Sequence, residues 1–513
     1  DPQGAMEEID VEMNVIRDFV RRVLLSEETF QEEGNTFVNM FSGEWSGTSK
    51  LNKYDLSSMY FNYAGSIYSQ NFPIIDIVMN TMLKQEESDQ GRHFFRMFNG
   101  MGDDQRAAAY LNGKSFEQAV LDNTLSTEVF YEMMKLKGVY LRNYINSRLS
   151  SNEFKEFMAE FTKKYQFQEV NFTRLNSEFI RKFHFNLMDF IPNWYTINST
   201  PRFIVKGVDA DQVEVGDYTK YIVKFQVYNP TNVEGVISVN VEEGGGMFPG
   251  GPRGRRGRAA QMESKPAKNY IIEPQKYKEI RILCDERPSN LTINTNISQN
   301  LPSTIMQNFA KVTTTTTDTV TGIFDANATL FTFNPKEITV DNEDPGFRII
   351  ESNQKNKLQS FFKKESEDKY KNLNFWMPPS KWTATIGANY YGDYINSAVY
   401  KKSGSGSNKT EWTTQIQIPG FYEVFVYSSD LPMMGHRWGR NEEKKMQYYT
   451  VKHDDGEEEI SVETGRGRQG WMTLGSFYFS QGEAKITLSD KGSGSNQIIF
   501  ADAVKWVYTN NNK

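Results

Sequence analysis

The sequence predicts a multi-domain protein of mixed class, in which a helical domain is followed by two β-sandwiches. The chain has 513 residues, 38% hydrophobic and 14% aromatic, which is enough to bury several cores. Apolar residues recur at helical spacing up to about residue 200 and at strand spacing from about residue 202. Tryptophan and glycine-serine turns then concentrate after about residue 340, a pattern typical of a larger all-β domain.

Residues 1–201 are predicted to be helical because their apolar residues recur every three or four positions. Two stripes carry this prediction: Ile9, Met13, Ile16, Val20 and Val23, and then Phe154, Phe157, Met158, Phe161 and Tyr165. Ser150 and Glu153 precede the second stripe at the spacing of a capping box, in which each side chain bonds the other residue's backbone N–H. Ser115 and Gln118 repeat this signal. We therefore expect helices to begin directly after Ser115 and Ser150.

Residues 202–302 are predicted to form a small antiparallel sandwich of the immunoglobulin-like type. Apolar and polar residues alternate in short runs at 221–227, 237–241, 280–282 and 291–293. The Gly/Arg-rich segment 244–258, GGGMFPGGPRGRRGR, interrupts the sandwich and is predicted to be a loop. Ordering so many glycines would cost more conformational entropy than their contacts could offset. Its four arginines allow two interpretations, a solvated loop or a loop that holds an anionic partner.

Residues 303–339 are predicted to be a linker, with a low-complexity threonine run at 313–317. Residues 340–510 are predicted to form the larger sandwich. Six of the eight tryptophans of the chain fall in this last region: Trp376, Trp382, Trp412, Trp438, Trp471 and Trp506.

Charge and composition exclude several classes of function. The net charge of -7 argues against nucleic acid as a partner, because phosphate binding needs a concentrated basic surface. No stretch approaches the roughly 20 apolar residues of a membrane helix, and residues 1–6 lack the features of a signal peptide. The chain starts without Met, which leaves open that targeting segments or domains lie upstream. The single cysteine, Cys284, excludes an internal disulfide and is interpreted as a buried core residue.

Three motifs stand in a recognisable order between about residues 60 and 205. They are Lys135-Leu136-Lys137-Gly138, Tyr165-Gln166-Phe167 after an aromatic helix, and the segment 190–194 that ends in Trp194. In this order they resemble the helical part of the M1 (gluzincin) aminopeptidases. The resemblance implies a zinc peptidase ancestor, with Lys135 at the position of the family's transition-state tyrosine.

The chemistry of that family requires a HExxH helix and a distant glutamate, which together hold zinc and leave one position open for water. The four histidines here, His93, His184, His436 and His453, are solitary, so we predict no catalytic residue, no metal site and no cofactor in this chain. Glu33 resembles the third zinc ligand of the family. Either it is vestigial, with the decayed motif at 10–14, or the match is accidental and a true motif lies upstream. The end of a charged helix is the structural alternative for Glu33.

The C-terminal region carries a longer ordered series of motifs. They lie at 340–347, Trp412, 419–426, 449–451, 471–477 and 501–506. This series resembles the golvesin and xanthan-lyase C-terminal domain, a β-sandwich regarded as a carbohydrate-binding type of module. The resemblance implies binding rather than catalysis for this region.

Sugar binding uses exposed aromatic faces surrounded by polar side chains. The candidate ligand-binding residues lie in loop-like stretches between predicted strands: Tyr390, Tyr391, Tyr394, Arg437, Trp438 and Arg440. Packing within the fold is the alternative role for each of them. Trp412, Trp471 and Trp506 lie inside strand patterns and are predicted to fill the core.

Together these inferences predict a non-catalytic, extracytoplasmic protein or subunit of the cell envelope, derived from an M1 metallopeptidase, that binds a glycan or an envelope protein. Two alternatives remain open. The chain is the C-terminal part of an active M1 zinc aminopeptidase whose HExxH segment lies upstream or on another chain, or it is a structural component of a membrane-protein complex.

Overall fold

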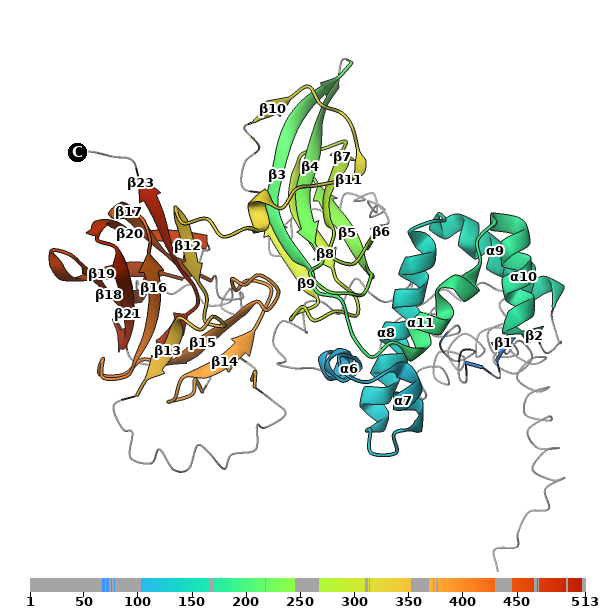
Figure 1. Ribbon diagram of the computed structural model, residues 1–513, viewed down its shortest axis with the longest axis horizontal. Coiled ribbons are helices and arrows are strands. Elements are labelled where there is room, and N and C mark those ends of the chain that lie inside the picture. Colours follow the sequence, from blue (N-terminus) through green and yellow to red (C-terminus); the bar gives the residue numbers. More distant parts are fainter. Residues whose placement is uncertain are drawn as a thin grey trace, which may run out of the picture.

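The computed structural model describes the larger part of the chain, and all structural statements below concern that part. The described residues are 67–69, 71, 72, 75, 78, 103–165, 170–216, 218–244, 267–309, 312, 314–351, 369–371, 373, 374, 377–429, 445–465, 468, 470–494 and 497–509. They form a helical part, a middle sandwich and a C-terminal sandwich, with the middle sandwich between the other two (Figure 1). None of the described helices has the length and apolar character needed to cross a membrane.

The helical part contains a short parallel pair of strands, β1 and β2, in addition to its helices. Its described elements are β1 (Ile67–Tyr68), α6 (Asp103–Leu111), α7 (Phe116–Leu121), α8 (Thr127–Asn146), α9 (Ser151–Lys164), β2 (Val170–Asn171), α10 (Phe172–Phe183), η2 (Leu187–Asp189) and α11 (Ile191–Thr196). Both predicted capping boxes are present, so α7 and α9 begin directly after Ser115 and Ser150 as expected. The stripe predicted at Ile9–Val23 lies outside the described residues.

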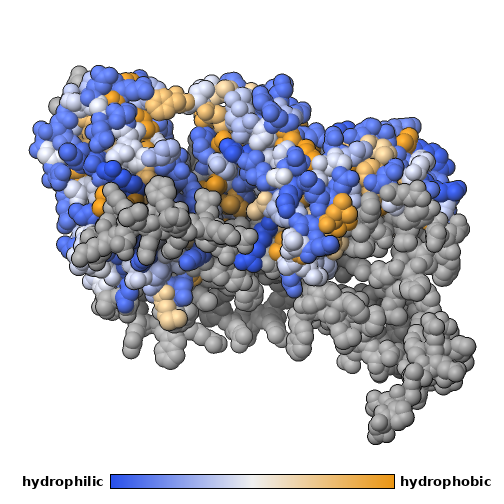
Figure 2. Space-filling view, turned by 60° about the horizontal axis from the view of Figure 1, so that its bottom comes forward, coloured by the Kyte–Doolittle hydropathy of each residue, from blue (hydrophilic) through white to orange (hydrophobic). Residues whose placement is uncertain are grey.

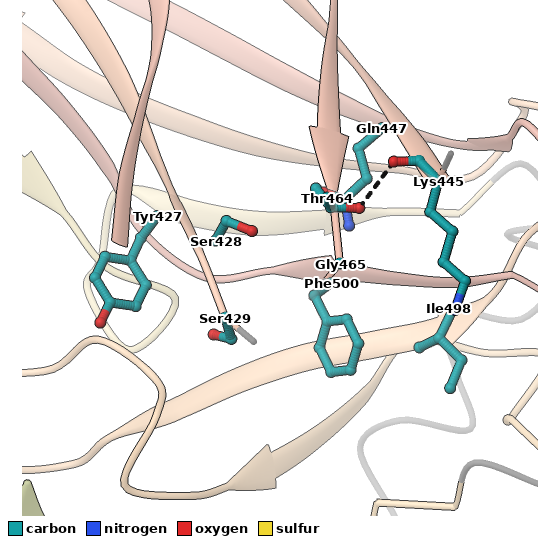
Figure 3. Close-up of a pocket in the computed structure, with 9 residues that line it drawn as sticks. All are labelled: Tyr427, Ser428, Ser429, Lys445, Gln447, Thr464, Gly465, Ile498 and Phe500. Carbon is teal, nitrogen blue, oxygen red and sulfur yellow. Dashed lines mark hydrogen bonds between the residues drawn. The ribbon is translucent and has the colours of Figure 1, made fainter. Parts of the chain in front are cut away.

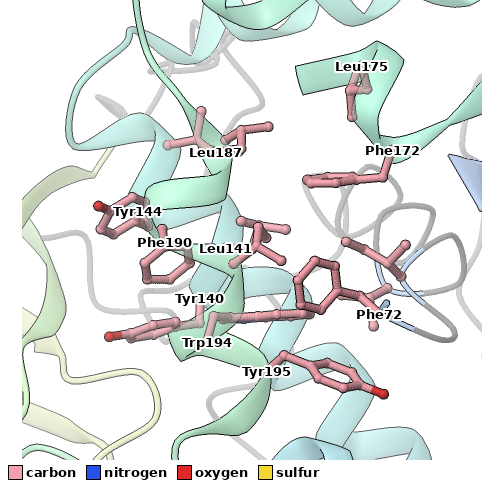
Figure 4. Packing of buried hydrophobic residues seen from close by; sticks show 14 of the residues in the cluster. Phe72, Tyr140, Leu141, Tyr144, Phe172, Leu175, Leu187, Phe190, Trp194 and Tyr195 are labelled. Carbon is pink, nitrogen blue, oxygen red and sulfur yellow. The ribbon is translucent and has the colours of Figure 1, made fainter. Parts of the chain in front are cut away.

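Aromatic side chains form a large share of the core of the helical part (Figure 4). The rings of Phe157 and Phe179 meet edge to face at 5.1 Å and join α9 to α10. The rings of Tyr144 and Phe190 stack at 3.6 Å between α8 and the chain before α11. The predicted stripe from Phe154 to Tyr165 is therefore confirmed as the buried face of α9.

The middle sandwich consists of two sheets, with strand orders β10-β3-β4-β7-β11 and β6-β5-β8-β9. Its strands are β3 (Ile204–Val215), β4 (Tyr218–Tyr228), β5 (Gly235–Glu243), β6 (Lys268–Ile272), β7 (Tyr277–Cys284), β8 (Pro288–Asn294), β9 (Thr304–Asn308), β10 (Thr315–Thr316) and β11 (Gly322–Asp325). Cys284 is fully buried, as predicted. Most of the Gly/Arg-rich segment 244–258 lies outside the described residues.

The prediction of a linker at 303–339 is wrong for much of its length. β9 pairs with β8, β10 with β3, and β11 with β7, so this segment extends both sheets of the middle sandwich. These strands have only two to five residues, which is too short for alternation to be recognised in the sequence.

The C-terminal sandwich packs a four-stranded sheet, β12-β23-β17-β20, against a five-stranded sheet, β13-β16-β21-β18-β19, with a small sheet β14-β15-β22 beside them. Its strands are β12 (Glu337–Val340), β13 (Phe347–Ile350), β14 (Thr383–Ile386), β15 (Ser397–Lys402), β16 (Lys409–Ile416), β17 (Gly420–Ser428), β18 (Lys445–His453), β19 (Gly456–Thr464), β20 (Gly470–Phe479), β21 (Gly482–Gly492), β22 (Ile498–Ala501) and β23 (Val504–Thr509). Trp412 and Trp506 fill the core as predicted, but Trp471 is only half-buried and lies on the outer face of β20.

The middle sandwich contacts both of its neighbours through specific bonds. Toward the helical part, the Asn143 side-chain amide of α8 donates to the Asn296 side-chain oxygen at 2.7 Å. Toward the C-terminal sandwich, the Leu301 backbone N–H donates to the Tyr394 carbonyl at 2.9 Å, and the Asn396 N–H donates to the Leu301 carbonyl at 2.7 Å. The loop 387–396 therefore joins the two sandwiches.

Candidate functional site

The outer face of the sheet β12-β23-β17-β20 carries an unusual number of aromatic side chains. Successive side chains of a strand point to opposite faces, so β17 divides into two sets. The inward set, which is buried, is Tyr422, Val424 and Val426, and the outward set is Phe421, Glu423, Phe425 and Tyr427. Three of the four outward residues of β17 are thus aromatic, on a face where a solvated sheet usually carries polar side chains.

Neighbouring strands place further rings beside those of β17. Tyr427 pairs in register with Trp471 of β20, and their rings meet edge to face at 5.3 Å. Phe421 pairs with Tyr478, and these rings also meet edge to face, at 5.4 Å. Phe421 and Tyr478 are 39% and 37% exposed, which is high for side chains of this size.

Tyr391 of the loop 387–396 completes the group of rings next to β17. Its ring lies 5.1 Å from that of Trp471 and 5.6 Å from that of Tyr427. Its backbone N–H points at the buried Asp502 carboxyl, with the two oxygens at 3.3 and 3.2 Å. Burial raises the pKa of the Tyr391 phenol, which therefore stays protonated.

We call these six residues the aromatic track: Tyr391, Phe421, Phe425, Tyr427, Trp471 and Tyr478. From Phe421 to Tyr427 the track follows seven residues of one strand, or about 20 Å at the usual rise of a strand. This length accommodates several sugar rings in a row. Aromatic faces bind the C–H-rich faces of sugars, and polar groups between the rings can bond the hydroxyls.

Polar side chains lie between the aromatic residues of the track. Glu423 stands on β17 between Phe421 and Phe425, opposite Ser476 of β20. The Lys505 ammonium lies 4.6 Å from the centroid of the Trp471 ring and 3.3 Å from a carboxylate oxygen of Glu337. The face of the molecule seen in Figure 2 is mostly hydrophilic, and its hydrophobic residues gather in small patches.

A small recess opens at the Tyr427 end of β17 (Figure 3). Its lining residues are Tyr427, Ser428, Ser429, Lys445, Gln447, Thr464, Gly465, Ile498 and Phe500. Several of its polar side chains are used within the fold. Ser429 donates to Asp502 at 3.2 Å, Thr464 donates to the Lys445 carbonyl at 3.2 Å, and the Gln447 amide bonds the Phe500 backbone. The recess therefore offers fewer polar groups to a ligand than its lining suggests.

The structure separates the three tyrosines that the sequence grouped as ligand-binding candidates. Tyr390 is only 7% exposed and packs against Phe500 in a small core, so the expectation of an exposed ring is wrong for this residue. Tyr394 lies under Arg202, whose guanidinium is 4.0 Å from the ring centroid, and thus contributes to the contact between the sandwiches. Tyr391 alone joins the aromatic track.

The other three candidates, Arg437, Trp438 and Arg440, lie outside the described residues. They belong to the segment 430–444 that connects β17 to β18. The residues on either side of this segment, Ser429 and Lys445, both line the recess. A ligand-binding role for these three residues therefore stays a prediction.

Buried carboxyl groups lie beneath the track, where the end of β12, the loop 387–396 and the turn between β22 and β23 come together. Burial, together with the nearby Asp344, Glu343 and Asp393 carboxylates, raises the pKa of Asp341 to about 8. Burial also raises the pKa of Asp502, with Asp341 as the neighbouring charge. Among the described residues, no group of three or more His, Cys, Asp or Glu side chains has the arrangement of a metal site.

The residues tied to zinc chemistry can be placed only in part. His184 is an exposed residue that ends α10 in the left-handed conformation, and the His453 Nδ1 accepts the Asp455 N–H at 3.3 Å. Lys135 forms a half-buried ion pair with Glu132 on α8, with the two charged atoms 2.8 Å apart. Glu33, His93, His436 and the segment 10–14 lie outside the described residues.

Sequence reasoning missed most of the aromatic track, although a signal for it was present. The run 421–427, FYEVFVY, alternates between two faces, and assigning Tyr422, Val424 and Val426 to the core leaves aromatic residues facing solvent. The position of Trp471 could not be found in this way, because a register shift lies between Val424 and Phe425 in the pairing of β17 with β20.

Comparison with protein families identifies part of this region. The model of the golvesin C-terminal domain matches residues 371–508, so the resemblance predicted for the C-terminal sandwich is confirmed for this segment. A comparison with curated proteins finds no match.

Solved structures with detectable similarity come from several bacteria. A Paenibacillus xanthan lyase is 14% identical, with 60% of this chain and 26% of that chain covered and a TM-score of 0.24. A two-domain protein of unknown function from Bacteroides fragilis is 9% identical, with 60% and 94% covered and a TM-score of 0.15. The secreted serine protease VesC from Vibrio cholerae is 9% identical, with 59% and 50% covered and a TM-score of 0.13. The chain spans about a quarter of the length of the xanthan lyase.

Proposed function

We propose that the C-terminal sandwich, whose residues 371–508 match the golvesin C-terminal domain, binds a glycan chain on its aromatic track and that the protein acts by binding. The observation that carries this proposal is the outward face of β17, where Phe421, Phe425 and Tyr427 follow one another beside Trp471 and Tyr478. Exposing these rings to water is unfavourable, and a ligand that covers them recovers that free energy.

Each ring contributes modestly, so binding requires several rings at once. A stacked aromatic pair adds roughly 1 kcal/mol beyond the burial of its area. Rings fixed on one sheet bind successive sugars of the same chain without a further entropic cost for each contact. The track is therefore expected to bind a polymer and to retain short oligosaccharides poorly.

The test is affinity gel electrophoresis of the full chain against a panel of polysaccharides. The double variant Phe421→Ala/Tyr478→Ala removes the two most exposed rings of the track, and we expect it to weaken retention about tenfold or more with little change in melting temperature. Tyr218→Ala is the matched control, because Tyr218 is 73% exposed on the middle sandwich, away from the track. Equal retention of the double variant and the unchanged protein would contradict a role for the track.

The loop that carries Arg437, Trp438 and Arg440 is proposed as a second contact for the same glycan. Support comes from the position of its two ends in the recess beside Tyr427, at one end of the track. Trp438→Ala is expected to weaken binding while the melting temperature stays nearly unchanged. A large fall in melting temperature would instead assign Trp438 to the core.

We also propose that the helical part derives from an M1-like peptidase. A second proposal is that the protein works outside the cytoplasm, at the cell envelope, where its partner is a glycan or an envelope protein. Support for the first point is the contact between two of the resembling motifs. The Lys137 ammonium donates to the Trp194 carbonyl at 2.5 Å, and the Trp194 indole N–H donates to the Lys137 carbonyl at 3.1 Å. Zinc analysis of the purified chain, with Glu33→Ala as the comparison, distinguishes this binding function from an active peptidase.

A further inference from the structure

We infer that the aromatic track selects uncharged glycans and rejects chains that carry carboxylate groups. This inference rests on the proposed glycan-binding function and adds the chemical class of the ligand. The geometry that points to it is a row of side chains across the middle of the track. Glu423 of β17 pairs in register with Val507 of β23, and Val507 pairs with Glu337 of β12. Two carboxylates therefore flank one apolar residue on the outward face.

The spacing of these carboxylates makes them hard for a ligand to avoid. Adjacent strands lie about 4.8 Å apart, so the backbones of Glu423 and Glu337 are separated by about 10 Å across the face. Along β17, Glu423 stands two residues from both Phe421 and Phe425. A glycan chain that contacts both of these rings passes directly over Glu423.

The positive charge on this face is already paired. Among the described outward-facing residues of the four strands, Lys505 is the one basic side chain. Its ammonium lies 3.3 Å from a carboxylate oxygen of Glu337. The same ammonium lies over the Trp471 ring and near the Phe425 ring, at 4.6 and 5.7 Å from their centroids. Lys336, which precedes β12, is not counted on this face, because its ammonium lies 6.0 Å from the ring of Tyr508, which contacts the inward-facing Tyr422. The four strands thus carry two carboxylates and one ammonium on this face, so the middle of the track has a net negative charge, whereas the two arginines proposed as a second contact belong to the segment that follows β17, beyond Tyr427.

This charge pattern suits hydroxyl groups. An ionised carboxylate accepts hydrogen bonds and donates none, so Glu423 can accept from the hydroxyls of a neutral sugar. A uronate placed at the same position brings two carboxylates together with no cation between them. Such like-charge contacts are a common means of rejecting the wrong partner.

The experiment compares neutral and anionic polymers that share a backbone. The full chain is run through affinity gels that contain hydroxyethyl cellulose or carboxymethyl cellulose, and hydroxyethyl starch or carboxymethyl starch. We expect retention by the neutral member of at least one pair, with retention by its carboxymethylated counterpart about tenfold weaker at low salt. The difference should shrink in salt concentrated enough to screen surface charges.

The double variant Glu337→Gln/Glu423→Gln removes both carboxylates with little change in size and leaves the Lys505 ammonium unpaired. It should gain at least tenfold in retention by the carboxymethylated polymer relative to the neutral one, so that the preference between the two polymers is lost. Glu457→Gln/Glu458→Gln on the edge strand β19 is the matched control for net charge and should change neither.

The outcomes separate the two proposals. Retention by the anionic polymer equal to or stronger than that by the neutral one overturns the selectivity and leaves glycan binding intact. A preference for the neutral polymer that the glutamine variant keeps unchanged also overturns it, because the carboxylates are then not its cause. Absence of retention by all four polymers overturns the selectivity. If, in addition, the Phe421→Ala/Tyr478→Ala variant has no effect on any polysaccharide of the wider panel, glycan binding is rejected with it.

Discussion

Lys137 is a buried lysine on α8 that faces no carboxylate in the described structure. Its side chain is 4% exposed, and its ammonium bonds the Trp194 carbonyl and lies 5.7 Å from the centroid of the Phe116 ring. Burial lowers the pKa of Lys137 to about 7, from an ordinary value of 10.5. A fall of this size corresponds to a free-energy cost on the order of 5 kcal/mol for keeping the amine charged in the fold.

Lys137 is expected to make the helical part more stable as the pH rises from about 7 toward 10. Over this range the unfolded chain binds a proton at this lysine and the folded chain does not, so raising the pH favours the folded state. Lys137→Met should remove most of this slope. The measurement is urea unfolding at a series of pH values, followed by the helical signal in circular dichroism, because the described α-helices lie in the helical part.

Lys135→Met is the matched control, because Lys135 lies two residues away on the same helix and has a carboxylate partner, Glu132. It should leave the slope in place. Stability of the unchanged protein that is flat or falls between pH 7 and 9.5 would contradict an uncharged Lys137.

At the scale of elements, the buried carboxyls connect the end of β12, the loop 387–396 and the turn between β22 and β23. Asp341 is buried and accepts the Asn342 N–H at 2.8 Å, and Asp502 accepts from Tyr391 and Ser429. The pKa of Asp341 is raised to about 8 by burial and by its acidic neighbours. This site therefore prefers a protonated carboxyl in the folded protein.

The C-terminal sandwich is expected to lose stability as the pH rises from about 4 to 8. A group whose folded pKa lies above its unfolded pKa stabilises the fold fully below the unfolded value, and that contribution disappears as the pH passes the folded value. Asp341→Asn mimics the neutral carboxyl and should flatten the dependence. Melting temperatures of the sandwich across this pH range provide the measurement.

Asp455→Asn, in the exposed turn between β18 and β19, serves as the comparison and should behave like the unchanged protein. A dependence that is equally steep in Asp341→Asn would assign the effect to other groups, with Asp502 as the next to test.

The elements also show how far the sequence could predict this protein. Helix α9 and its capping box follow from local signals, because the serine, the glutamate and the apolar stripe lie within one segment. The buried Trp412 and Trp506 follow from alternation within long strands. Tyr390 and Tyr391 are neighbours of the same type, yet one enters a core and the other joins the track. That difference depends on Phe500 and Trp471, which are about 100 and 80 residues away, so no local pattern contains it.

At the scale of the whole molecule, the three parts are not independent domains on flexible linkers, because each is in contact with the next. Val236 and Ile297 of the middle sandwich belong to the core of the helical part. On the other side, Arg202 covers Tyr394, and Lys206 lies 3.4 Å from Asp393. Each sandwich nevertheless has its own buried core, formed by different residues.

A fragment of residues 334–513 is expected to fold alone, because it contains both large sheets and the complete core of the C-terminal sandwich. It should melt cooperatively at a lower temperature than the same sandwich in the full chain, since it lacks the bonds from Leu301 and the Arg202 contact. Calorimetry of the fragment and the full chain is the measurement. A fragment without a cooperative transition would show that the middle sandwich is required for folding.

The loop 387–396 has a fixed number of residues between its two points of attachment. The backbone of Tyr391 is held by Asp502 inside one sandwich, and the backbone of Tyr394 is held by Leu301 of the other, with two residues between them. Adding or deleting one residue there would break one of the two attachments and move either the track or the junction. Related chains that keep both contacts should therefore differ in the lengths of their other loops and keep this interval constant, which makes the interval a marker for aligning distant relatives.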